Sequence, residues 1–128
     1  MKLLLDTHIA LWAAKGSANL PSAAAALIGD ASNEIYVSVI SLWEIGVKAS
    51  NGKLDVTATQ ASTVFDICGY RTLDINRFHI RTLDGLAMCP GHKDPFDRML
   101  VAQALTEGMT LVTADAKMTA YRPTTRVV

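Results

Sequence analysis

Four acidic side chains, spread along the chain, are of the type that binds hard divalent cations. Asp6 and Asp115 each directly follow a short apolar run that is typical of a β-strand. Glu44 lies about one turn into a helical segment, and Asp97 lies in the first turn of another. Carboxylates that gather in a partly dry cleft repel one another, and a divalent cation removes that repulsion. If the fold brings the four together, they predict a Mg²⁺ or Mn²⁺ site and phosphate chemistry.

Each carboxylate also has a structural explanation. Asp6 and Asp115 stand where aspartate is favoured as a helix N-cap. Glu44 follows Ser41 at the spacing of a capping box and precedes Lys48 at the spacing of a helix-surface ion pair. Taken singly, each position is better explained by capping. Serine, threonine or asparagine would serve as well in a cap, however, so capping leaves the use of carboxylates at every position unexplained.

The elements that must position these residues alternate along the chain. We expect strands over residues 3–5, 34–39, 71–75, 110–113 and 126–128. We expect helices over 7–15, 21–28, 41–49, 57–68, 76–86, 94–107 and 115–121. Alternation of this kind predicts an α/β fold, with a parallel sheet of about four to five strands flanked by helices on both faces. Ligands bind beyond the carboxyl ends of such strands, where the four carboxylates would meet.

Composition limits the class of protein. The 128 residues fit one domain, residues 1–128, and half of them are hydrophobic, which indicates a globular chain. Twelve basic and twelve acidic residues balance, so net charge gives no argument for nucleic acid. Cys68 and Cys89 match no disulfide framework or zinc spacing, and we expect Cys68 in the core. No apolar run is long enough for a signal peptide or a membrane span, so a reducing cytoplasm is the expected location.

Four segments carry a more specific pattern: Leu4-Leu5-Asp6-Thr7-His8, Ser41-Leu42-Trp43-Glu44-Ile45, His92-Lys93-Asp94-Pro95-Phe96-Asp97-Arg98 and Leu111-Val112-Thr113-Ala114-Asp115. In order, spacing and total length they resemble the PIN-domain family, and most closely the VapC-type toxins of bacterial toxin–antitoxin pairs. The resemblance covers essentially the whole chain. The Asp-Pro-Phe-Asp-Arg stretch is its most specific piece.

The resemblance implies a PIN-like fold with an acidic pocket that binds Mg²⁺ or Mn²⁺. It implies a metal-dependent endoribonuclease that cleaves single-stranded loops of RNA, such as tRNA or rRNA. Such toxins form homodimers and are inhibited by a VapB-like antitoxin protein. Asp6, Glu44, Asp97 and Asp115 match the acidic positions of the family, as both catalytic and metal-binding residues. No acidic position is missing.

Around these four, several residues have alternative roles. Asp94 lies three residues before Asp97, so it is either an auxiliary acid or the helix cap. We assign the cap to Asp94 and the metal to Asp97. Arg98 could contact an RNA phosphate or pair with a carboxylate. Lys93 and His92 precede the helix in a loop, where they either contact RNA phosphate or are surface residues.

Other classes of protein fit less well. Haloacid-dehalogenase-like phosphatases need a second aspartate two residues after the first, where this chain has His8. Receiver domains need an acidic pair at the end of the first strand, and only Asp6 stands there. A catalytically silent PIN-like module that binds RNA or a partner is the alternative that stays open. Trp12 and Trp43 lie on apolar helix faces and are expected in the core or at a dimer or antitoxin surface.

Overall fold

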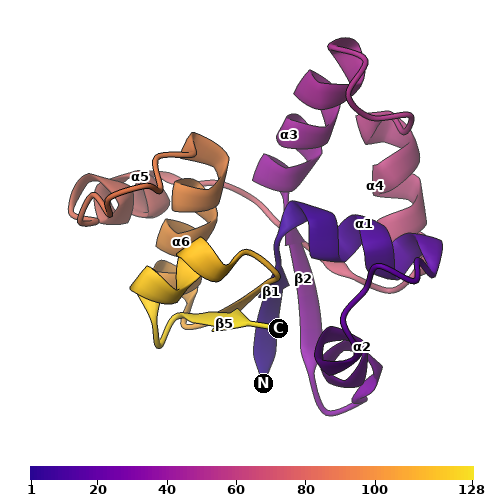
Figure 1. Cartoon of the computed structure of the whole chain (residues 1–128), viewed down its shortest axis with the longest axis horizontal. Helices are drawn as coiled ribbons and strands as arrows, with labels where there is room; N and C mark the ends of the chain where they lie inside the picture. The colour runs from indigo at the N-terminus through magenta and orange to yellow at the C-terminus, as the bar shows by residue number, and fades with distance from the viewer.

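A computed structural model describes residues 1–128 and contains one sheet of five parallel strands. Strands β1 and β2 run side by side through its middle (Figure 1). The strand order is β3-β2-β1-β4-β5, with every neighbouring pair parallel. The bounds are Lys2–Leu5 for β1, Glu34–Ser38 for β2, Arg71–Leu73 for β3, Thr110–Thr113 for β4 and Thr125–Val127 for β5. This architecture confirms the predicted parallel α/β fold.

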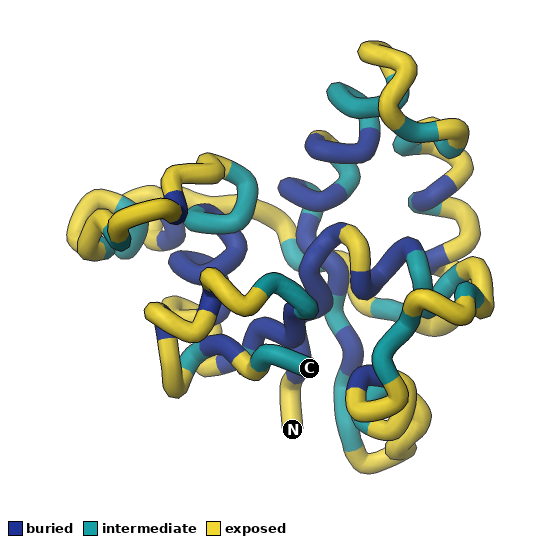
Figure 2. Tube along the Cα trace, viewed as in Figure 1, coloured by how far each residue is buried: buried dark blue, intermediate teal, exposed yellow.

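Six α-helices and one 3₁₀ helix connect the strands. They are α1 (Thr7–Lys15), α2 (Ser22–Gly29), α3 (Val39–Ser50), α4 (Ala58–Ile67), α5 (Arg77–Asp84), α6 (Pro95–Glu107) and the 3₁₀ helix η1 (Ala116–Tyr121). The tube in Figure 2 is buried along the central strands and α6 and exposed over most of α5. No helix combines the length and the apolar character that a membrane span requires.

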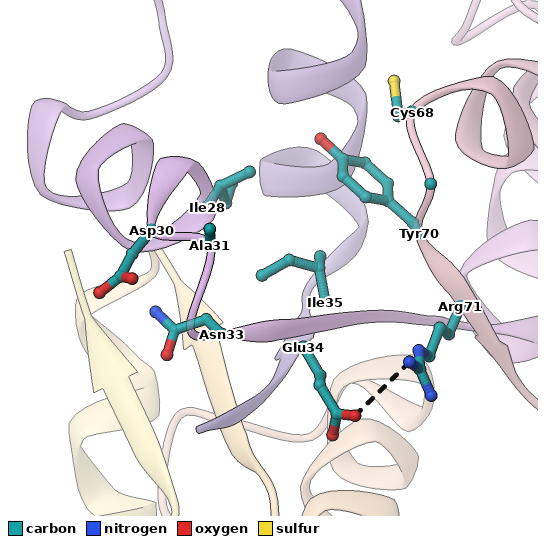
Figure 3. A pocket seen from close by; sticks show the side chains of 10 residues that line it. Ile28, Asp30, Ala31, Asn33, Glu34, Ile35, Cys68, Tyr70 and Arg71 are labelled. Atoms are coloured by element: carbon teal, nitrogen blue, oxygen red, sulfur yellow. Dashed lines mark ion pairs between the residues drawn. The ribbon is translucent and has the colours of Figure 1, made fainter.

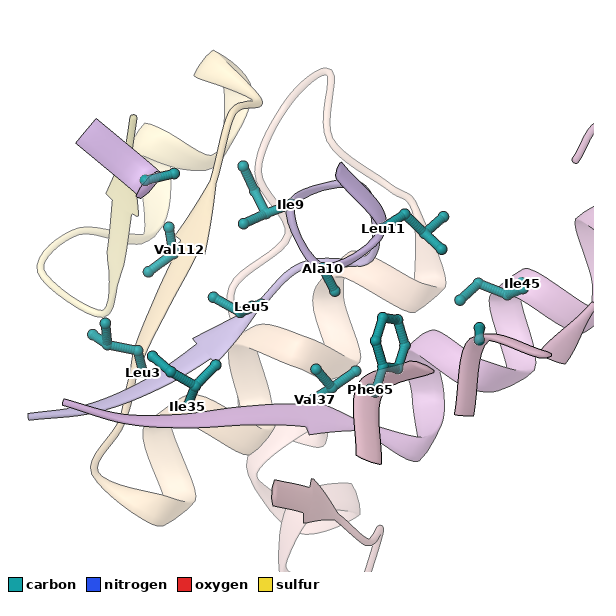
Figure 4. Packing of buried hydrophobic residues seen from close by; sticks show 12 residues of the cluster. Leu3, Leu5, Ile9, Ala10, Leu11, Ile35, Val37, Ile45, Phe65 and Val112 are labelled. Atoms are coloured by element: carbon teal, nitrogen blue, oxygen red, sulfur yellow. The ribbon is translucent and has the colours of Figure 1, made fainter. Parts of the chain in front are cut away.

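Two hydrophobic clusters, one on each face of the sheet, hold the helices in place. Alternation along β1 divides its side chains between them, because successive residues of a strand point to opposite faces. Leu3 and Leu5 pack with residues of α1 and α4 (Figure 4). Leu4 packs instead with α6 and η1. Strand β1 is therefore buried on both faces, and this packing fixes the position of its carboxyl end.

Three local expectations were wrong. Helix α3 begins at Val39, two residues before the predicted Ser41, because the Ser38 hydroxyl accepts a hydrogen bond from the Ile40 amide (3.0 Å) and serves as N-cap. Strand β3 ends at Leu73 and does not extend through residue 75. Cys68 is exposed and lies outside the core, since it forms the C-cap of α4 and not part of its buried face.

Candidate active site

The candidate site lies where the topology of the sheet reverses. From β1 the chain adds β2 and then β3 on one side, and afterwards returns to add β4 on the other side of β1. Ligands of open α/β sheets bind at such a switch point, beyond the carboxyl ends of the strands. Asp6 directly follows β1, and only Ala114 separates Asp115 from the end of β4. These two carboxylates therefore come from the two strands that flank the switch point.

Asp6 is buried and fixed at both carboxylate oxygens. Its Oδ1 accepts the Ile9 amide (2.9 Å), which makes Asp6 the N-cap of α1. Its Oδ2 accepts the Thr113 hydroxyl (2.5 Å), and the Thr113 oxygen in turn accepts the Asp115 amide (3.1 Å). Burial raises the pKa of Asp6, against the effect of the hydrogen bonds from Thr113 and Ile9. A buried carboxylate held this firmly is oriented for a ligand.

Glu44 is also buried, with a side chain about 6 % exposed, although it belongs to a helix. The Thr7 hydroxyl donates to Glu44 Oε1 (2.6 Å), and Lys48 Nζ lies 2.5 Å from Oε2. The predicted ion pair with Lys48 is therefore present. The capping box between Ser41 and Glu44 is not, because Ser41 is inside the helix and its hydroxyl lies 3.0 Å from Thr7 Oγ1.

Asp94 and Asp97 have different environments at the start of α6. Asp94 Oδ1 accepts the Asp97 amide (3.0 Å), which is the geometry of an N-cap. Burial raises the pKa of Asp97 to about 6, and the charges of Asp94, Asp6 and Glu44 add to that rise. The acid that follows β1 and the acid of α3 thus both act electrostatically on Asp97 at the start of α6.

Asp115 follows β4, on the other side of β1 from α3 and β2. Its Oδ1 accepts the Lys117 amide (2.9 Å), so Asp115 is the N-cap of η1. One ligand atom each from Asp115, Asp97 and His92 lie within 4.8 Å of one another. Asp97 Oδ1 and Asp115 Oδ2 have no hydrogen-bond donor in the protein. Oxygens without donors, gathered in this way, fit the ligand set of Mg²⁺ or Mn²⁺.

The residues predicted to contact RNA fall in three different environments. Lys93 is exposed, and its contact with phosphate stays a prediction. His92 was expected in an exposed loop, which is wrong: its ring is 4 % exposed and contacts Tyr121 and Asp97. Its burial removes His92 from the surface that a phosphate could reach.

Arg98 pairs with no carboxylate in the structure, so that one of its two predicted roles is wrong. Its guanidinium donates to the carbonyl oxygens of Leu86 (3.1 Å) and Ala87 (3.0 Å) and to the Tyr121 hydroxyl (3.4 Å). The segment that follows α5 thus supplies two acceptors for the guanidinium and Tyr121 a third. Contact of Arg98 with an RNA phosphate stays a prediction.

An aromatic pair lies between the helices that carry Glu44 and Asp97. The rings of Trp43 and Phe96 are 5.0 Å apart and nearly perpendicular (76°). Trp43 is 63 % exposed, so it is not the core residue that one expectation allowed, and the surface alternative stands. Trp12 is half-buried and packs against the first cluster.

Sequence reasoning missed the hydroxyl groups that orient the carboxylates. Thr7 directly follows Asp6, and Thr113 lies two residues before Asp115. Their closeness to the acids in the chain was a signal that could have been used. Tyr121 gave no comparable signal, because it reaches His92 from 29 residues away.

The two hollows of the surface lie elsewhere. The larger, about 530 Å³, is at the amino ends of β2 and β3, where Figure 3 shows Tyr70, Cys68 and the Glu34–Arg71 ion pair. The smaller, about 300 Å³, lies between η1 and the segment that follows α5. Neither is lined by any of the four predicted site carboxylates. The candidate acidic site and the larger of the two hollows are therefore at different ends of the sheet.

Comparison with known proteins agrees with the fold. The PIN domain family matches residues 3–122, and the chain belongs to that family. Within it, the chain is similar to ribonuclease VapC22 of Mycobacterium tuberculosis, with 30% identity over 122 residues, which cover 94% of this chain and 92% of that protein. This likeness places it among the VapC-type members of the family.

Two solved structures share the fold. One is VapBC from Salmonella typhimurium bound to DNA, with a TM-score of 0.68 and 21% identity, covering 100% of this chain and 97% of that one. The other is VapBC2 from Rickettsia felis bound to a DNA fragment from its promoter, with a TM-score of 0.66 and 21% identity, covering 100% and 98%.

Proposed function

We propose that this protein is a Mg²⁺- or Mn²⁺-dependent endoribonuclease that cleaves single-stranded loops of RNA, tRNA or rRNA among them. The observation that carries the proposal is geometric: ligand atoms of Asp97 and Asp115 lie within 4.8 Å of one another, and the Thr113 hydroxyl links Asp115 to the buried Asp6. Carboxylates gathered in this way repel one another, and a divalent cation removes that repulsion. The similarity to a ribonuclease of the same family supports RNA as the substrate.

Each acidic residue has its own task in this proposal. Asp6, Asp97 and Asp115 would hold the cation, which when bound polarises a phosphate oxygen and lowers the pKa of water. Glu44 would orient the attacking water. Thr7 and Lys48 hold one oxygen each of the Glu44 carboxylate, so its direction is set before RNA arrives. The Thr113 hydroxyl does the same for Asp6.

The first experiment measures cleavage of purified tRNA and total RNA. Activity should require Mg²⁺ or Mn²⁺, stop in excess EDTA and return when the metal is restored. Asp6→Asn should be inactive, while Glu34→Gln, at the opposite end of β2, should cleave normally. Cleavage that persists in EDTA and in Asp6→Asn would overturn the proposal. RNA binding without any cleavage by the native protein would favour the alternative, a catalytically silent module.

We further propose that the protein is the toxin of a toxin–antitoxin pair, a homodimer inhibited by a VapB-like antitoxin. Its similarity to VapC22 and its fold likeness to the toxin–antitoxin complexes support this assignment. The test is co-expression with the product of the neighbouring reading frame. A stable complex with suppressed RNA cleavage is expected. Light scattering should give the mass of a dimer for the free protein. A monomer, or full activity in the presence of that product, would contradict this part of the proposal.

A further inference from the structure

A chain of hydrogen-bonding side chains leads from Arg98 to Asp97. Arg98 Nη1 lies 3.4 Å from the Tyr121 hydroxyl, which lies 3.2 Å from His92 Nδ1. His92 Nε2 then lies 3.3 Å from Asp97 Oδ2. The rings of His92 and Tyr121 pack edge to face, 5.4 Å apart, and both residues are buried. We call Arg98, Tyr121, His92 and Asp97 the Arg98–Asp97 relay.

The turn before α6 explains why His92 points inward. The His92 amide donates to the Cys89 carbonyl (3.1 Å) across Pro90 and Gly91. Gly91 has a φ of +78°, which L side chains adopt only with strain. Proline followed by a residue of positive φ is the pattern of a type II turn. This turn reverses the chain just before the helix and brings the imidazole against Asp97.

The donors of the relay have one consistent order when the imidazole is neutral. Arginine has no acceptor, so the Tyr121 oxygen accepts a hydrogen bond from the Arg98 guanidinium. The phenolic O–H is then free to donate to His92 Nδ1. Because a neutral imidazole carries one proton, that proton is on Nε2 and is donated to Asp97 Oδ2. The Tyr121 hydroxyl and both ring nitrogens of His92 then each have a partner, and Asp97 Oδ1 keeps its lone pairs.

We propose that His92 is a positioning residue for Asp97: as an Nε2–H donor locked by Tyr121 and Arg98, it binds Oδ2 and leaves Oδ1 for the divalent cation. The role rests on the proposed metal-dependent function. Hydrogen bonds to metal-ligating carboxylates orient them, and loss of such a partner costs about 10–100-fold in metal affinity. Asp6 has this support from Thr113, and the relay provides it for Asp97.

The competing role is direct ligation by His92, because its ring lies among the atoms close enough to share an ion. The geometry favours positioning. Nε2 faces Asp97 Oδ2 and carries the proton in the relay, so it offers no lone pair to a cation. Mg²⁺ and Mn²⁺ also prefer oxygen ligands, which Asp97 and its neighbours supply.

The test is a titration of the metal-free protein with Mn²⁺, in the absence of RNA. His92→Ala should weaken Mn²⁺ binding about 10–100-fold. His92→Gln places an N–H near the position of Nε2 and should bind within about threefold of the native protein; His92→Asn places it near Nδ1 and should behave like His92→Ala. Glu34→Gln is the matched control and should bind normally. Native affinity in His92→Ala, or no rescue in His92→Gln, would overturn the proposal.

Two spectroscopic measurements separate the roles without relying on activity. Nitrogen-15 NMR of the metal-free protein should show the Nε2–H tautomer of His92, and Tyr121→Phe should lose this preference and weaken Mn²⁺ binding. Hyperfine coupling between bound Mn²⁺ and the His92 nitrogen would mean direct ligation and would overturn the proposal. Circular dichroism checks that each variant is folded. If His92→Ala does not fold, Tyr121→Phe provides the test in its place. If the native protein and the variants bind Mn²⁺ as expected but the native protein does not cleave RNA, only the proposed ribonuclease function is refuted.

Discussion

Two glutamates, one at the start of β2 and one in the helix that follows it, lie in different environments at the two ends of the sheet. Glu34 opens the strand and pairs with Arg71 at 3.5 Å, while Glu44 lies beyond its end and pairs with Lys48 at 2.5 Å. The Glu34 side chain is 41% exposed and the Glu44 side chain 6%. Glu34 borders the larger hollow, whereas the charge of Glu44 acts on the pKa of both Asp6 and Asp97. Burial beside like charges, and not the size of a cavity, distinguishes the candidate active site.

The largest expected difference is in catalysis. Glu44→Gln should lower kcat/KM for RNA cleavage by about 10²–10³, the scale for loss of one group that acts on transition-state charge. Glutamine keeps the size of the side chain and can still accept from Thr7, so the fold should survive. Glu34→Gln should cleave at the native rate. Equal losses in the two variants would remove the distinction between the two ends of the sheet.

Metal binding should stabilise only the end that holds the acids. At a free metal concentration of about 100 times the dissociation constant, Mn²⁺ should add about 2.7 kcal/mol to the free energy of unfolding. Asp97→Asn should lose most of this gain, and Glu34→Gln should keep all of it. Thermal melts with and without Mn²⁺ measure the difference. A gain that is undiminished in Asp97→Asn would mean that the ion binds elsewhere.

The hydroxyl that links Asp6 to Asp115 should matter for folding as well as for the site. Thr113→Val removes the donor to Asp6 Oδ2 and the acceptor of the Asp115 amide, both in a buried place. The expected loss of stability is about 1–3 kcal/mol, the cost of unpaired buried polar groups. Thr113→Ser keeps the hydroxyl and is the control. Urea unfolding compares the two, and native stability in Thr113→Val would show that the hydroxyl contributes nothing to folding.

A smaller effect should appear in the pH dependence of stability. The folded protein holds the Asp97 proton to about pH 6, whereas the ordinary pKa is 3.8. Without metal, stability should therefore fall as the pH rises through this range. Asp97→Asn should be more stable than the native protein at pH 7.5, by on the order of 1 kcal/mol, and equal to it near pH 4. Asp66→Asn, on the exposed side of α4, is the control and should show no such trend in urea unfolding in EDTA.

The smallest effect is expected at the amino-terminal hollow. Cys68 is exposed there, so Cys68→Ser should change stability by no more than about 0.5 kcal/mol. Mn²⁺ binding and RNA cleavage should be unchanged. Loss of either in Cys68→Ser would mean that the hollow communicates with the acidic site, and the comparison would then fail.

The parts of this fold that local rules govern could be predicted from the sequence. The apolar run of β1, followed directly by Asp6, and the Asp94-Pro95 start of α6 both form as expected, because strand burial and helix capping depend on near neighbours. The carboxylates that meet at the sheet edge follow from the parallel topology. Each of these inferences needs only residues close in the chain and one general rule about where strands end.

Tertiary contacts decided what the sequence could not show. His92 is buried because Tyr121, far along the chain, provides a ring and a hydroxyl for it. Arg98 is occupied by carbonyl oxygens of a loop whose path no local pattern predicts. The choice of Ser38 over Ser41 as the cap of α3 depends on where β2 ends, and both serines satisfied the local rule.

The open indole on α3 also gives the protein its own optical sensor. Trp43 and Trp12 are the only tryptophans of the chain. Trp12 is packed against the first hydrophobic cluster, so a change in emission wavelength at constant fold would come mainly from Trp43. Its indole lies against Phe96, the residue before Asp97. Any antitoxin segment or RNA that covers the acidic site could therefore be followed by intrinsic fluorescence, without a label.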